Sequence, residues 1–260
     1  MCGRYATTRA RQELLDQFAI QADETGSELE PDYNVAPTDP VPAVLIRRPA
    51  GDAEDEEEAV RQLRMLRWGL VPSWAKDMSG GARMINARVE TVAEKPAYRR
   101  AFTRRRCLLP ADGYYEWYTL QGDPAEDEKG RKTKPRKQPF YIHPKDGGVM
   151  AMAGLYELWR APDGEWVWSC TLITTDAPDD LGRIHDRMPM IVTPDRWDAW
   201  LDPDLTVPEE IHGLLTPAMA GTMDAYPVSP LVGNVRNNGP QLIEPAANGD
   251  IPGSTSGTLF

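Results

Sequence analysis

The chain has 260 residues, of which 41% are hydrophobic, so it can bury an ordinary core in one large domain or two small ones. Its formal net charge of -11 disfavours a general affinity for nucleic acids, because phosphate binding requires a positive surface. The three widely spaced cysteines argue against a disulfide framework, and the sequence shows neither a signal peptide nor an apolar run long enough to cross a membrane. We therefore expect a globular protein of the cytoplasm.

The first predicted elements are a helix and a hairpin. Residues 9–20 place Leu14, Leu15 and Phe18 among charged residues at helical spacing, which predicts a short amphipathic helix behind the N-terminus. Residues 41–47 and 60–68 are predicted strands, joined by an acidic loop at 49–60. Arginines then concentrate in the segment 99–106, which leaves a local basic surface available in an acidic chain.

The remaining pattern is also rich in strands. Further strands are predicted at 107–110, 140–143, 149–155, 166–174 and 190–192, and helices at 96–104, 194–200 and 208–214. The segment 121–137 is a predicted charged loop, and 246–260 a flexible tail. Because helices and strands do not alternate regularly, we expect an α+β fold: one domain over residues 1–245, with mainly antiparallel sheets in a strand-rich core and short peripheral helices.

Cys2 is the most unusual candidate nucleophile. If Met1 is removed, this residue carries an α-amine and a thiol one carbon apart, and such an aminothiol can trap an aldehyde as a Schiff base that closes to a thiazolidine ring. The α-amine has an ordinary pKa near 7.7 to 8.0, against about 10.4 for lysine, so far more of it is uncharged at neutral pH. Taken alone, a cysteine at position 2 is more often incidental.

Two titratable residues could move protons. Glu116 lies between Tyr115 and Trp117 in a predicted strand, and a carboxylate held against aromatic rings has a raised pKa. His185 lies in a predicted loop between charged neighbours and could act as a general acid or base. The simpler interpretations are a solvated strand glutamate and a structural histidine.

Other candidates bind rather than react. Asn86 and Arg88 alternate in a predicted strand, so they share a face; an amide can orient an amine, and a guanidinium can hold a phosphate. Trp68 suits core packing, whereas Trp74 in the following turn could stack on a base. The histidines and cysteines are scattered, with no spacing typical of metal ligands, so we expect no metal and no other cofactor.

Together these motifs resemble the SOS response-associated peptidase family, whose members shield abasic sites in single-stranded DNA. The resemblance covers about residues 2–245. The segments that carry it are Met1-Cys2-Gly3-Arg4, Tyr33-Asn34-Val35-Ala36-Pro37, Trp68-Gly69, Asn86-Ala87-Arg88-Val89-Glu90-Thr91, Asp112-Gly113-Tyr114-Tyr115-Glu116-Trp117, Met152-Ala153-Gly154-Leu155, Ile184-His185-Asp186-Arg187-Met188-Pro189 and Val232-Gly233-Asn234-Val235.

The resemblance implies a covalent sensor of abasic sites. Cys2 would form the thiazolidine crosslink after Met1 is removed, by self-processing or by an aminopeptidase. Glu116 would be the acid and base, His185 would open the sugar ring and reverse the crosslink, and Asn86 would hold the α-amine. The implied DNA-binding residues are Arg4, Asn34, Pro37, Trp74, Arg88 and Thr174. Ala75 departs from members that carry a second tryptophan there, which puts strand wedging by paired rings in doubt.

The same resemblance implies a monomer associated with the nucleoid, acting on abasic sites in single strands, including those at single-strand/double-strand junctions. Two alternatives remain open. An N-terminal-nucleophile amidohydrolase or peptidase would also use Cys2, with its α-amine as base. A single-strand binder without catalysis would use the arginines and Trp74, and its binding would be indifferent to an abasic site.

Overall fold

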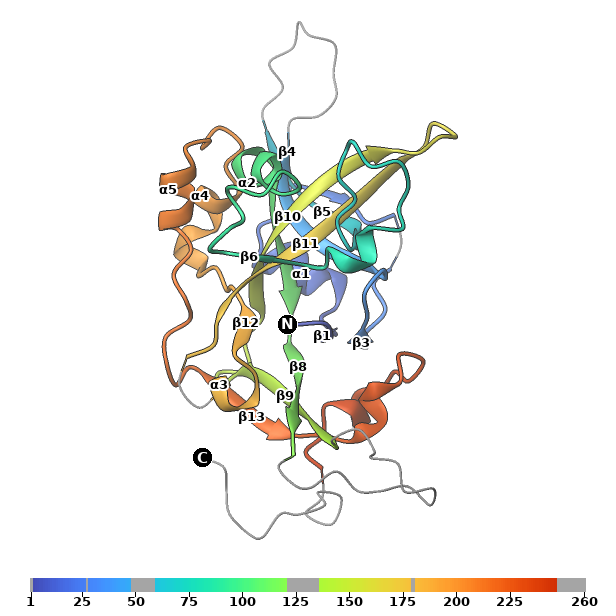
Figure 1. Ribbon diagram of the computed structural model, residues 1–260, viewed down its shortest axis with the longest axis vertical. Helices are drawn as coiled ribbons and strands as arrows, with labels where there is room; N and C mark the ends of the chain where they lie inside the picture. The colour runs from blue at the N-terminus through green and yellow to red at the C-terminus, as the bar shows by residue number, and fades with distance from the viewer. Residues whose placement is uncertain (1, 27, 48–58, 121–135, 179–180, 247–260) are drawn as a thin grey trace, which may run out of the picture.

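A computed structural model describes residues 2–26, 28–47, 59–120, 136–178 and 181–246 (Figure 1). Two β-sheets and a few short helices form a single domain, which confirms the predicted α+β class. The smaller sheet has the strand order β13-β9-β8-β1-β3, and all its neighbouring strands are antiparallel. Its strands are β1 (Tyr5–Thr7), β3 (Asp32–Val35), β8 (Gly113–Thr119), β9 (Lys137–Pro144) and β13 (Met223–Pro227).

The larger sheet has the order β12-β11-β10-β7-β4-β5-β2, with β6 paired to β11. Most of its pairs are antiparallel, but β11 runs parallel to β5 and to β6, and β2 parallel to β5. Its strands are β2 (Ala22–Glu24), β4 (Pro40–Arg47), β5 (Val60–Trp68), β6 (Asn86–Arg88), β7 (Arg106–Ala111), β10 (Met150–Arg160), β11 (Trp166–Asp176) and β12 (Arg187–Pro189). The β10–β11 hairpin is the longest in the described chain.

Helices cover one face of the larger sheet. A buried cluster joins apolar residues of that face, such as Val44 and Ile173, to the helices α1 (Arg11–Gln17), α2 (Arg99–Arg104), α4 (Trp197–Leu201) and α5 (Pro208–Gly213). Phe18, directly after α1, stacks on Trp197 with ring centroids 4.5 Å apart. Proline opens α5, where a fixed φ suits the first turn and no amide donor is lost. The smaller sheet packs against the opposite face of the larger sheet.

A second buried cluster lies between the two sheets. It contains Cys2 and Tyr5 at the N-terminus, Trp68 from β5 and Tyr114 from β8. Tyr5 meets Trp68 edge to face at 5.2 Å, an arrangement that aromatic quadrupoles favour. Gly69, next to Trp68, has φ +129°, and an added Cβ there would lie 2.7 Å from the Gly81 carbonyl oxygen. The chain therefore turns away from Trp68 at a position that requires glycine.

The structure confirms most predicted elements, with shifted ends. The strand 60–68 coincides with β5, and the helices predicted at 9–20, 96–104 and 208–214 are shorter than expected. The helix predicted at 194–200 is a 3-10 turn, η2 (Pro194–Arg196), followed by α4. The strand predicted at 190–192 is wrong: β12 ends at Pro189, and only Ile191 forms an isolated bridge, with Met152.

Some expectations fall on residues that the structure does not describe. The acidic loop at 49–60 and the charged loop at 121–137 lie almost entirely outside the described residues, as do Met1 and all but the first residue of the tail at 246–260. The strands β1, β2, β3 and β13 were not predicted, because three to five residues give too short a run for alternation to register. Within the described ranges, no helix has the length and apolarity of a membrane span.

Candidate active site

The site forms where the N-terminal strand of the smaller sheet meets β6 of the larger one. Cys2 is completely buried, and its thiol lies 3.9 Å from the Arg4 carbonyl oxygen, to which it donates a hydrogen bond. Its own carbonyl accepts a hydrogen bond of 2.7 Å from Nδ2 of Asn86. A side chain from one sheet thus fixes the backbone of the candidate nucleophile in the other.

The position of Asn86 follows from strand pairing. β6 runs parallel to β11, with Asn86 opposite Leu172 and Arg88 opposite Thr174, so these residues share a face as predicted. The Nδ2 group of Asn86 is engaged with Cys2, whereas its buried Oδ1 has no hydrogen-bond partner among the described residues. A buried acceptor without a donor costs free energy, so this oxygen is suited to receive an N–H group that arrives beside Cys2.

Glu116 is buried, at 4% exposure, and faces the cluster between the sheets. Burial raises its pKa to about 7, and the nearby Asp186 carboxylate acts in the same direction. Burial also raises the pKa of the Cys2 thiol, with Glu116 as the second cause. The pKa of Tyr114 is raised by burial, then by Cys2 and Glu116, which shows that the three side chains share one environment.

The raised pKa of Glu116 was predicted, but not for the right reason. Its sequence neighbours Tyr115 and Trp117 point to the opposite face of β8, where they join a third cluster around Val232 and Leu242. The desolvation of Glu116 comes instead from the cluster that contains Cys2 and Tyr114. Alternation along the strand separates the carboxylate from its aromatic neighbours.

His185 follows the short helix α3 (Leu181–Ile184), which packs against β8. Its Nδ1 accepts a hydrogen bond from the Arg187 backbone N–H at 3.0 Å and lies 2.9 Å from Oδ1 of Asp186. The first contact requires Nδ1 without a proton and the second requires a proton on Nδ1, so the two contacts belong to different protonation states of this nitrogen. Burial lowers the pKa of His185 against the opposing effect of Asp186, which favours the neutral ring with its proton on Nε2.

Sequence reasoning missed the network around Arg187. This residue is 7% exposed, and its guanidinium donates to both carboxylate oxygens of Glu90 at 2.7 and 3.1 Å. It also donates to Asp176 and to the Thr174 carbonyl oxygen, each at 2.6 Å. Arg187 thereby ties the segment after His185 to β11 and to the turn after β6. Both Glu90 and Arg187 lie in motifs already singled out, but their pairing spans 97 residues.

The predicted DNA-binding residues differ in how much they expose. Arg88 and Trp74 are exposed, Trp74 to 70%, and Pro37 is half-buried. Thr174 is buried, with its backbone held by Arg187. These positions lie on different elements, and only Thr174 and Arg88 are directly paired in a sheet.

Arg4 and Asn34 are tied to each other. Nη1 of Arg4 donates to Oδ1 of Asn34 at 2.8 Å and to the Val232 carbonyl oxygen at 3.0 Å, and burial lowers the pKa of Arg4. Asn34 is 3% exposed, and its Nδ2 donates to the carbonyl oxygens of Asn234 and Asn237. The side chain of Asn34 is therefore fully used inside the protein, where it positions Arg4.

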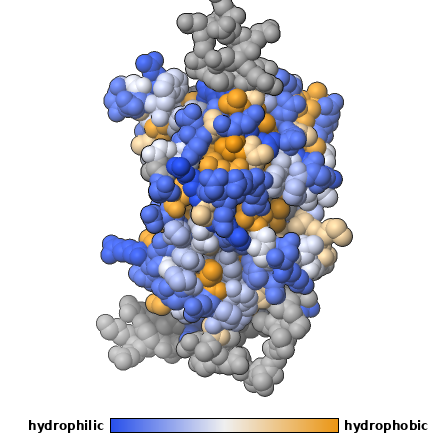
Figure 2. Space-filling model, turned by 180° about the vertical axis from the view of Figure 1, so that it is seen from behind, coloured by the Kyte–Doolittle hydropathy of each residue, from blue (hydrophilic) through white to orange (hydrophobic). Residues whose placement is uncertain are grey.

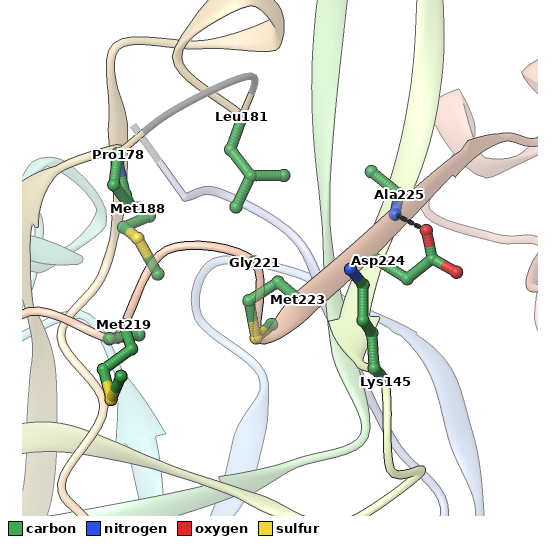
Figure 3. A pocket seen from close by; sticks show the side chains of 10 residues that line it. Lys145, Pro178, Leu181, Met188, Met219, Gly221, Met223, Asp224 and Ala225 are labelled. Atoms are coloured by element: carbon green, nitrogen blue, oxygen red, sulfur yellow. Dashed lines mark hydrogen bonds between the residues drawn. The ribbon is translucent and has the colours of Figure 1, made fainter. Parts of the chain in front are cut away.

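A cavity of about 480 Å³ lies beyond α3 (Figure 3). Its wall includes Leu181, Met188, Met219 and Met223, and Lys145 stands at its edge. Its lining does not include Cys2 or any of the other three predicted catalytic residues. Among the described residues, no group of three or more histidine, cysteine, aspartate or glutamate side chains could hold a metal ion.

A family model for the SOS response associated peptidase matches residues 1–235. The chain belongs to this family. Among known relatives, the abasic site processing protein YoqW of Bacillus subtilis is 40% identical over 244 residues, which cover 94% of this chain and 99% of the relative. The abasic site processing protein HMCES of Mus musculus is 30% identical, over 95% of this chain and 76% of its own length.

The fold of this family member agrees with a solved structure. A crystal structure of a protein from Bacteroides thetaiotaomicron superposes with a TM-score of 0.75 at 27% identity. The superposition covers 95% of this chain and the whole of the other protein. The fold is therefore shared with a protein that is only 27% identical in sequence.

Proposed function

We propose that this protein captures abasic sites in single-stranded DNA by a covalent thiazolidine crosslink at Cys2, after Met1 has been removed. The names of the relatives support abasic-site processing as the general activity. The observation that carries the covalent step is the geometry of the N-terminus. Cys2 is held by Asn86 through its carbonyl and lies beside a carboxyl with a pKa of about 7.

The chemistry starts with the sugar. An abasic sugar is a cyclic hemiacetal, and protonation of its ring oxygen by Glu116 or His185 opens it to an aldehyde. The Cys2 amine attacks the aldehyde carbon, and water leaves as the imine forms. The thiol then adds across the C=N bond and closes the thiazolidine, so that the net reaction releases one water molecule. Because the pKa of the thiol is raised, its proton needs an acceptor, and ionised Glu116 provides one.

Asn86 is the proposed positioning residue for the amine. Its Nδ2 holds the Cys2 carbonyl, which leaves the buried Oδ1 to accept from the α-amine of the same residue. An amide that binds both ends of Cys2 would fix the direction of the amine lone pair. Arg88 and Arg4 would bind flanking phosphates, Arg88 from an exposed position and Arg4 through the part of its guanidinium that Asn34 leaves available.

Intact mass spectrometry tests the proposal directly. The purified protein should lack Met1, and incubation with abasic single-stranded DNA should add one oligonucleotide mass less one water. The Cys2→Ala variant should form no adduct, and neither should protein with a tag left before Cys2, because both lack the free aminothiol. Cys170→Ala removes another buried thiol and serves as the matched control, which should still react. An adduct that persists in Cys2→Ala would refute the proposal.

The amidohydrolase alternative uses the same residue and is separated by the same samples. An N-terminal-nucleophile amidase would turn over amide substrates and form no stable adduct with abasic DNA. A binder without catalysis would show neither adduct nor turnover, and its affinity would not depend on the abasic site. The raised pKa of Glu116 favours a reactive site over this last alternative.

A further inference from the structure

The segment 230–238 has no role in the function proposed above. It follows β13 and begins with the 3-10 turn η3 (Pro230–Gly233), and it contains the motif Val232-Gly233-Asn234-Val235. We call it the asparagine loop. η3 packs against β9, and the following turn η4 (Pro240–Leu242) against β3, at the side of the smaller sheet (Figure 1).

The asparagine loop is held firmly in place. Asn34 donates to the carbonyl oxygens of Asn234 at 3.0 Å and Asn237 at 2.8 Å. Within the loop, Asn237 donates to the Leu231 carbonyl oxygen at 2.8 Å, and the Arg236 backbone N–H donates to Oδ1 of Asn234 at 3.1 Å. These bonds satisfy backbone groups that a surface loop would otherwise leave to water, so the loop presents one defined shape.

This rigid loop displays apolar side chains to solvent. Leu231 is 55% and Val235 57% exposed, and Arg236 beside them is also exposed. Few large hydrophobic side chains in the described chain are exposed to this degree, and polar side chains dominate the rear surface (Figure 2). Between the two exposed residues, Val232 is fully buried against Tyr115 and Tyr141, which anchors the loop to the sheet. Leu231 and Val235 are therefore held by a fixed backbone and are available to contact a partner.

Arg4 connects the loop to the candidate active site. Its guanidinium donates to the Val232 carbonyl oxygen at 3.0 Å, and its backbone lies two residues after Cys2. Arg4 therefore bridges the segment that carries the nucleophile and the backbone of the loop at Val232. Arg4 and Arg236 both add positive charge at the loop.

We infer that the asparagine loop binds a base next to the abasic site in single-stranded DNA. This inference rests on the proposed function and adds a second contact to it. Loss of a base leaves the neighbouring base with one uncovered aromatic face, which must stack on something else or face water. Leu231 and Val235 offer an apolar surface for that face, as aliphatic side chains do in proteins that separate stacked bases, and the exposed Arg236 offers a charge for a phosphate.

The experiment measures equilibrium binding rather than crosslinking. The probe is a single strand with a central tetrahydrofuran residue, an abasic analogue that cannot open to an aldehyde, labelled for fluorescence anisotropy. The double substitution Leu231→Ala with Val235→Ala should raise Kd about fivefold, the low end of the range for stacking contacts, since both side chains are aliphatic. Val207→Ala removes an apolar side chain of 45% exposure elsewhere and should leave Kd unchanged.

A second probe identifies what the loop touches. In this strand the nucleotides on both sides of the central residue also carry no base, and here the double variant should bind as wild type does. Equal Kd values for wild type and double variant on the first probe would overturn the inference. So would an equal loss on both probes, because the contact would then not involve bases. Since neither probe can crosslink, a failure of the thiazolidine chemistry appears only in the mass measurement and is distinguishable from these results.

Discussion

Among single residues, Glu116 links the site to the stability of the fold. Its pKa rises from 4.5 to about 7 on folding, so the folded state binds a proton more tightly than the unfolded chain does. Stability contributed by the protonated carboxyl is complete below pH 4.5 and is lost as pH rises through 7. The predicted loss of unfolding free energy is about 3 kcal/mol, an upper value for so strong a shift.

Glu116→Gln removes this titration because its amide does not ionise. We expect urea unfolding of the wild type to give a lower free energy at pH 8 than at pH 5, and the variant to lose most of that difference. Glu210→Gln, on the exposed face of α5, is the matched control and should behave as wild type does. If the variant keeps the full pH dependence, Glu116 does not have a raised pKa.

Single residues also show what sequence reasoning can reach. The sequence singles out Cys2, Asn86, Glu116 and His185 as candidates because each is an unusual residue in a short motif, and their catalytic roles remain predictions. It could not show that the cluster between the two sheets buries Glu116. It also could not show that Asn34 donates both its amide hydrogen bonds to carbonyl oxygens about 200 residues away. Both depend on which segments the fold brings together, and no local pattern encodes that.

At the scale of elements, β12 is held by its pairing with β11 and by the guanidinium of Arg187. Arg187 makes a two-bond contact with Glu90 and also holds Asp176 and the Thr174 carbonyl, so it joins β12 to β11 and to the turn after β6. Lysine has no planar fork and cannot reproduce these bonds. Arg187→Lys should therefore lower the free energy of unfolding by about 2 kcal/mol, a value reduced because Glu90 is partly exposed.

Chemical denaturation at constant pH measures this effect. Arg100→Lys, on the exposed side of α2, is the control and should change the free energy of unfolding by less than about 0.5 kcal/mol.

The packing of the segment after β12 explains why a strand was wrongly predicted at 190–192. Met190 and Val192 have the apolar alternation of a strand, yet their side chains fill the cluster beneath the helices after the strand has ended.

For the whole molecule, the question is how an acidic chain binds a polyanion. Its net charge of -11 repels DNA at long range, so attraction must come from a few arginines near the site. If the protein neutralises about two phosphates of an undamaged single strand, a plot of log Kd against the logarithm of the salt concentration should have a slope of magnitude about 1.4. Arg88→Gln should reduce that slope by about 0.7, because Arg88 is exposed beside Asn86.

A salt titration followed by fluorescence anisotropy provides the slope. Arg99→Gln, on α2, lies on the helix-covered face of the larger sheet and should leave it unchanged. Equal slopes for wild type and Arg88→Gln would exclude Arg88 as a phosphate contact.

The overall class, α+β with mainly antiparallel sheets, could be predicted from composition and strand spacing. The parallel pairs of β11 could not be predicted, because they join segments that no hairpin connects.

The hydrogen bond between Asn86 and Cys2 has a consequence for how the protein is made. An aminothiol at a chain end reacts with many aldehydes of metabolism, and the ribosome releases that end first. The residues proposed to assist it lie at positions 86, 116 and 185, so the arrangement around Cys2 forms only after most of the chain has emerged and both sheets have closed. If the proposed crosslink forms, reactivity toward DNA would be delayed until synthesis is nearly finished, and a truncated chain would carry Cys2 without the residues proposed to assist it.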